Sequence, residues 1–314
     1  MRADYHFHPN LPKKRPERCL RAIWRAIERH QMDAMVCTEH VFKDAPNAYR
    51  QLIAAKPLYR RTHIFPGAEL VSGDGGGVDV IAFGREDWYD EHALLLKPFA
   101  LSLEEMITYL ETTDLSYYIP HPYLLKTPLK QLYRGDEAVK KFLSSVPAFE
   151  AFNGCFLHVE HVCCSKPLRR MTRRLTQNLQ ESSRLDPERI PDGTFRFLAV
   201  GSDAHHPKEI GLAVDMPCDD VSSRENVFTC ITSNTDIGSI VVPPQLRPLM
   251  RTLSAGWITY KEGRIRRRIK QRKLPRSNRK PAAEMQLAPA RLTALKKLRM
   301  KMLRSSRRRE TVRQ

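Results

Sequence analysis

The sequence predicts a parallel, barrel-like α/β fold, and three observations favour it. Short apolar runs of strand length recur along residues 1–260, and segments with helical spacing lie between them. About seven strand–helix repeats can be counted, which is the pattern of a parallel β/α architecture. Polar or charged residues stand where several of the apolar runs end. In parallel barrels the carboxyl ends of the strands form the functional rim.

The first expected strand carries His6 and His8. Residues i and i+2 of a strand face the same side, so these two imidazoles would lie next to each other while Phe7 points into the packing behind them. Neutral imidazoles on one rigid strand suit Zn, Mn or Fe. The alternative is a strand end whose histidines are merely solvated. Asp203 and His205 repeat the same spacing far along the chain, and this repetition favours a metal site.

The remaining elements follow from periodicity. The expected helices have apolar residues three and four apart, and they span 19–30, 47–55, 103–111, 136–145, 166–181 and 227–232. The later expected strands are short runs with apolar and β-branched residues, and they span 34–40, 62–69, 78–84, 116–122, 147–153, 195–201, 212–216 and 239–242. Asp79 lies inside one of these runs, where a charged residue requires a partner.

The excess positive charge is confined to the C-terminal segment. Residues 261–314 hold 21 Lys and Arg against 3 Asp and Glu, whereas residues 1–260 hold 32 of each. The net charge of +18 therefore belongs to the last 54 residues. We expect a metal-binding barrel over 1–260 and a basic, partly helical extension over 261–314, with a linker and an amphipathic helix at 288–303.

Such an extension predicts salt-sensitive, sequence-independent association with nucleic acid, because Lys and Arg contacts to phosphate need no base readout. A solvated tail, binding to anionic lipid and packing back on the barrel are the alternatives. The seven cysteines show no Cys-x-x-Cys spacing and are expected to be reduced thiols. We expect a soluble, cytoplasmic protein, because neither a leader pattern nor an apolar run of membrane-spanning length is evident.

The residues at the strand ends form five ordered motifs: Asp4-x-His6-x-His8, Thr38-Glu39-His40, Gly67-Ala68-Glu69, His121-Pro122 and Gly201-Ser202-Asp203-Ala204-His205. Together, over residues 3–215, they resemble the polymerase and histidinol phosphatase (PHP) superfamily. Each motif alone is common by chance, whereas five in this order are specific. The resemblance implies a distorted (β/α)7 TIM-like barrel that holds two or three metal ions.

The resemblance also implies roles for individual residues. It gives first-metal ligands, with Glu69 bridging to a second metal, at His6, His8, Glu69 and Asp203. It gives second-metal ligands at His121 and Asp79, and third-site ligands at His40 and His205. Asp79 stands where many relatives have a histidine. Catalytic roles are expected for Glu69, Asp203 and His205. The loop 9–16 departs from the family pattern, because it lacks the usual acid or histidine and carries lysines that could contact substrate phosphate.

We therefore expect two divalent metal ions, Mn, Zn or Fe, and leave a third open. Two cations about 3.5–4 Å apart can hold a hydroxide and polarise phosphoryl oxygens. The expected function is metal-dependent hydrolysis of a phosphoester in a phosphomonoester, a nucleotide or an oligonucleotide end. One alternative is a PHP-fold nucleic-acid-binding protein with little or no turnover, which the missing loop acid supports. Hydrolysis of another bond, such as an amide, is the second.

Single residues also have plain structural interpretations. His40 and His121 could be satisfied core histidines, but both close expected strands beside polar residues, which favours ligands. The Asp79 carboxylate could instead bond backbone amides. Glu150 and Asn153 are expected to buttress the barrel mouth rather than bind metal.

Overall fold

The computed structural model describes residues 1–74, 77–123, 128–154, 195–237, 239–242, 263–266 and 268–269. The chain divides into two compact units, Met1–Arg266 and Arg267–Gln314, and the elements described below belong to the first. The helices expected at 166–181 and 288–303 lie outside the described residues. Within the described residues, every helix is too short or too polar to cross a lipid bilayer.

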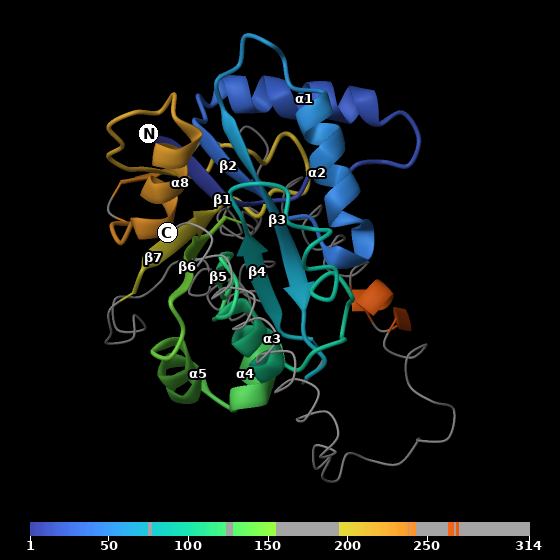
Figure 1. Ribbon diagram of the computed structural model, residues 1–314, viewed down its shortest axis with the longest axis vertical. Helices are drawn as coiled ribbons and strands as arrows, with labels where there is room; N and C mark the ends of the chain where they lie inside the picture. Colours follow the sequence, from blue (N-terminus) through green and yellow to red (C-terminus); the bar gives the residue numbers. More distant parts are fainter. Residues whose placement is uncertain are drawn as a thin grey trace, which may run out of the picture. The chain divides into compact units, whose positions relative to one another are not determined.

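A seven-stranded sheet organises the first unit, in the order β5-β4-β3-β2-β1-β8-β9 (Figure 1). Its strands are β1 (Arg2–Phe7), β2 (Ala34–Cys37), β3 (His63–Val71), β4 (Asp79–Phe83), β5 (Ser116–Tyr118), β8 (Ala213–Asp215) and β9 (Ile240–Val241). The first three run parallel, and the other neighbours pair antiparallel. Strands β6 (Ala148–Asn153) and β7 (Phe197–Gly201) pair in parallel as a separate sheet.

The prediction of a (β/α)7 TIM-like barrel is wrong. Four of the six strand pairings described in the large sheet are antiparallel, and the sheet is curled like half a barrel. Parallel neighbours need a crossover of about a dozen residues or more. The glycine-rich segment between Val71 and Asp79 is too short for one and turns the chain back, with a left-handed φ of 98° at Gly77.

Six α-helices have defined bounds within the part of the chain that the structure describes. They are α1 (Pro16–Arg29), α2 (Ala45–Ala54), α3 (Leu103–Leu110), α4 (Pro128–Tyr133), α5 (Asp136–Leu143) and α8 (Arg224–Ser233), and η1 (Val41–Lys43) is a 3-10 turn. Helix α1 begins at Pro16, which a first helical turn tolerates. Its Trp24 indole N–H donates to the carbonyl of Leu52 at 3.1 Å, and Figure 1 shows α1 and α2 as neighbours that run in different directions.

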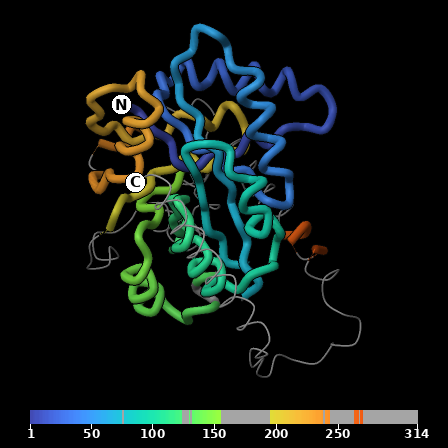
Figure 2. The backbone as a smooth tube through the Cα atoms, in the orientation of Figure 1, coloured from blue at the N-terminus to red at the C-terminus, as the bar shows by residue number. Residues whose placement is uncertain are grey.

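Strand β1 pairs with chain segments that are distant in the sequence. The amine of Met1, next to β1, donates to the carbonyl of Met216 at 2.8 Å, and in Figure 2 the blue first strand lies beside the yellow chain of the later strands. The backbone N–H of Asp203 donates to the carbonyl of His6 at 2.7 Å, and that of His8 donates to Ala204 at 2.9 Å. The polar ends of β1 and β7 are therefore fixed next to each other.

Candidate metal centre

Two imidazoles from β1 converge on one point. The Nε2 atoms of His6 and His8 lie 3.0 Å apart, and both side chains are completely buried. The strand alternation expected from sequence explains this, because Tyr5 points to the opposite face and packs on Phe197 with ring centroids 6.0 Å apart. Two ring nitrogens directed at the same point are placed as ligands of one cation.

Glu69, in β3, faces imidazoles with both of its oxygens. Its Oε2 lies 2.6 Å from His40 Nδ1 and 3.5 Å from His8 Nε2, whereas its Oε1 lies 3.5 Å from His121 Nε2. A carboxylate that presents its two oxygens to two sets of nitrogen donors has the geometry of a bridging ligand.

Asp203 completes the approach from the end of β7. Its Oδ1 lies 3.4 Å from His8 Nε2 and 3.6 Å from His6 Nε2. Its Oδ2 accepts a hydrogen bond from the Asn153 amide at 3.3 Å. The backbone here adopts a left-handed φ of 48°, and His121 does the same at 33°. Such strain in residues other than glycine is typical of functional sites.

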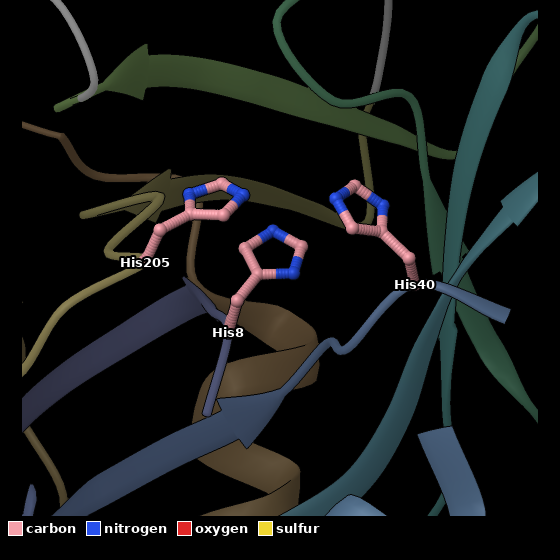
Figure 3. Close-up of side chains that lie close together, drawn as sticks. All are labelled: His8, His40 and His205. Carbon is pink, nitrogen blue, oxygen red and sulfur yellow. The ribbon is translucent and has the colours of Figure 1, made fainter. Parts of the chain in front are cut away.

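Three overlapping groups result, each with ligand atoms within 4.8 Å of one another, namely His6, His8 and Asp203; His6, Glu69 and His121; and His8, His40 and His205. We call these seven residues the metal centre. Figure 3 shows the His8 ring between those of His40 and His205, with centroid distances of 4.5 and 4.2 Å. Buried carboxylates require a positive partner, which protonated imidazoles or a bound metal ion can supply. An all-nitrogen and oxygen donor set without thiolate fits divalent Zn, Mn or Fe.

The electrostatics of the metal centre favour cations. Burial opposes ionisation of Glu69, but His40, His121 and His8 hold its pKa well below the usual value. The pKa of Asp203 is lowered in the same way, because the effect of His6, His8 and His205 exceeds that of its burial. Burial likewise opposes the charge of His121, yet its bond to Glu69 raises that pKa to about 9. Metal ligands must be deprotonated, so a metal ion that binds beside these ionised carboxylates would displace protons from the imidazoles.

Two further carboxylates orient the imidazoles from behind. Glu150 Oε1 lies 3.0 Å from His6 Nδ1, and its Oε2 accepts the backbone N–H of His121 at 2.7 Å and the Asn153 amide at 2.9 Å. Glu39 Oε1 lies 3.6 Å from His8 Nδ1. Carboxylates behind metal-ligating histidines fix the ring tautomer and raise ligand basicity.

The sequence predicted a supporting rather than a ligating role for Glu150, but it did not predict the contact with His6, and it gave Glu39 no role of its own. The signal was present, since Glu150 stands in an apolar strand and Glu39 in the Thr-Glu-His motif. A buried carboxylate at either place must have a partner. For Glu39, burial would raise the pKa, but the nearby His8 ring and the Lys43 ammonium hold it at about 2.

The structure thus brings seven predicted ligands together, and it places the eighth, Asp79, beside them. The Asp79 carboxylate, at the start of β4, pairs with the Arg266 guanidinium at 2.7 Å. Arg266 also lies 3.9 Å from Glu69 Oε1, so this pair borders the metal centre. Sequence reasoning required a partner for Asp79 but did not identify Arg266.

Comparison with solved structures adds a distant likeness. No family model matches the chain, and no curated protein matches it. The crystal structure of PsfC from Pseudomonas syringae PB-5123 is similar with 18% sequence identity and a TM-score of 0.49, over 83% of this chain and 98% of that chain. We transfer no residue role from PsfC, and the functional assignment rests on the metal centre itself.

Proposed function

We propose that the chain is a metal-dependent phosphoesterase. The observation that carries this proposal is Glu69, whose two oxygens face different imidazoles within a buried cluster of nitrogen and oxygen donors. Two divalent cations bound there would supply Lewis acidity for the phosphoryl group and activate water for attack on phosphorus. The expected substrate is a phosphomonoester, a nucleotide or an oligonucleotide end.

The side chains have distinct tasks in this proposal. Glu69 would contact both cations, and His6, His8 and Asp203 would hold the first of them. His121 would hold the second. We take the metals to be Mn, Zn or Fe and their number to be two. The group of His8, His40 and His205, which lacks a carboxylate, is where a third would bind.

His205 is set in one orientation by the chain itself. Its Nδ1 lies 3.0 Å from the backbone carbonyl of Asp203, which can only accept, so Nδ1 carries the proton. The other ring nitrogen, Nε2, then has the lone pair needed to bind a cation or to receive a proton.

Hydrolysis of p-nitrophenyl phosphate with added Mn tests the proposal. The Glu69→Gln and His8→Ala variants should lose bound metal and rate together, because each removes an atom from the metal centre. His92→Ala is the matched control, since His92 lies against Tyr109 outside the centre, and it should keep both. Equal rates in wild type, Glu69→Gln and His8→Ala would refute phosphoesterase activity on this substrate.

Nucleic-acid binding with little turnover is the second candidate, and the charge of residues 261–314 favours it, with 21 basic residues against 3 acidic ones. Deleting residues 267–314 should abolish retention of RNA at low salt while leaving the first unit intact. Retention that is unchanged by the deletion would exclude the segment as the binding element.

A further inference from the structure

The guanidinium of Arg266 reaches the metal centre from the last described turn of the first unit. Its Nη1 lies 2.7 Å and 3.0 Å from the two carboxylate oxygens of Asp79, and it donates to the carbonyl of Gly77 at 3.4 Å. Its Nη2 lies 3.9 Å from Glu69 Oε1. The side chain is 16% exposed, so this charge is largely removed from solvent.

An aromatic ring fixes the guanidinium from another side. The Arg266 guanidinium carbon lies 5.7 Å from the centroid of Phe42, within cation–π distance. Phe42 in turn stacks on His40 at 4.6 Å. Contacts to Asp79 and Phe42 together hold the cation in one place, so little side-chain entropy would be lost when it binds an anion.

The Arg266 guanidinium lies where a bound phosphoester would place its negatively charged oxygens. Glu69 Oε1, which Arg266 approaches to 3.9 Å, is also the oxygen that faces His121. A phosphoryl group bound at the centre carries negative charge on oxygens that do not bind the metals. A guanidinium recognises such oxygens in a planar, bidentate manner that an ammonium cannot reproduce.

We propose that Arg266 binds the phosphoryl group of the substrate and that Asp79 is the residue that positions it. This inference rests on the proposed phosphoesterase function and deepens it. Asp79 then acts through Arg266, and the C-terminal part of the first unit contributes directly to substrate binding.

Calorimetric titration of inorganic phosphate into the full-length, Mn-loaded protein tests this inference. Arg266→Ala should weaken phosphate binding about 10- to 100-fold, as expected for a charge-assisted hydrogen-bonding pair, without changing the metal content. The phosphate affinity of Arg266→Lys should fall between those of the wild type and Arg266→Ala, because lysine keeps the positive charge but lacks the planar pair of N–H donors of the guanidinium. The matched control is Arg264→Ala, which removes the same charge from an exposed residue of the same turn and should leave binding unchanged.

A double-mutant cycle isolates the role of Asp79. Asp79→Asn should weaken phosphate binding in the wild-type background and have little further effect in the Arg266→Ala background, because coupled residues are not additive. Equal losses in both backgrounds, accompanied by loss of metal, would overturn the positioning role and make Asp79 a metal ligand.

Failure of the two proposals can be told apart. If the wild type binds no metal, the phosphoesterase proposal fails, and the titration is repeated on the metal-free protein. Phosphate binding that still disappears in Arg266→Ala would support the role of the arginine. Phosphate affinity equal in wild type and Arg266→Ala, with or without metal, would overturn it.

Discussion

Replacing Glu150 with Gln should damage metal binding without disturbing the fold. In the wild type, Glu150 Oε2 accepts two hydrogen bonds, from the backbone of His121 at 2.7 Å and from Asn153 at 2.9 Å. Its Oε1, 3.0 Å from His6 Nδ1, can accept the ring proton, which leaves the lone pair on the Nε2 that points at His8.

A glutamine has one oxygen, and two donors compete for it on the Oε2 side. Its NH2 group would then face His6 Nδ1 and donate to it, so the ring proton moves to Nε2 and that atom can no longer bind a cation. Loss of a carboxylate behind a ligating histidine typically costs about 10- to 100-fold in metal affinity. The shape is nearly unchanged, so we expect the metal-free protein to unfold at nearly the wild-type denaturant concentration.

Competition with a chelator of known affinity measures the effect. Glu209→Gln is the matched control. Glu209 is also buried, and its carboxylate accepts the backbone N–H of His205 at 2.9 Å, whereas Glu150 contacts a ring nitrogen of His6. The metal affinity of Glu209→Gln should stay within about 3-fold of the wild type, a smaller change than the 10- to 100-fold loss typical for carboxylates behind ligating histidines. Wild-type affinity in Glu150→Gln would refute the tautomer argument.

Three further predictions follow from the packing and charge of the first unit. Gly201→Ala should lower the free energy of unfolding by about 1–3 kcal/mol, because the new Cβ would overlap the Cβ of His6. In the control Gly73→Ala the new Cβ meets only ordinary contacts, so its free energy of unfolding should stay within about 0.5 kcal/mol of wild type. Equal unfolding midpoints for the two variants would contradict this prediction. Burial raises the pKa of Asp4 from 3.8 to about 7, so the folded, metal-free protein binds the extra proton in that interval and loses up to about 1.4 kcal/mol of stability per unit of rising pH. Unfolding at pH 5 and pH 7 should show a smaller decline for Asp4→Asn, and an unchanged decline would exclude Asp4 as its source. Deleting residues 267–314 should also remove the steep dependence of RNA retention on salt, measured by filter binding at two salt concentrations.

Positions of strands and helices were largely predictable, and strand directions were not. The five expected helices that fall on described residues are found as α1, α2, α3, α5 and α8, whereas α4 was not expected. The nine expected strands are found as β1 to β9 with shifted ends. Periodicity reports which face of an element is buried, but it carries no information about whether neighbouring strands run parallel or antiparallel. The missing crossover between Val71 and Asp79 was the available warning, because so short a connection requires a hairpin.

That these seven residues lie together was predictable from sequence, because they are histidines and carboxylates at the ends of short strands. Partners that act between distant elements were not. Glu150 contacts His6 across 144 residues, and Arg266 contacts Asp79 across 187 residues. Such pairs are fixed by tertiary packing, so the sequence indicates only that a buried charge needs some partner.

Elemental analysis of the purified full-length protein tests the central claim most directly. After loading with Mn, Zn or Fe and removal of the excess, the wild type should hold about two ions per chain, as a two-cation site requires. His8→Ala should lose most of this metal, since His8 belongs to two of the three ligand groups, whereas His92→Ala should retain it. A wild type without metal, or a His8→Ala variant with the wild-type amount, would contradict the account.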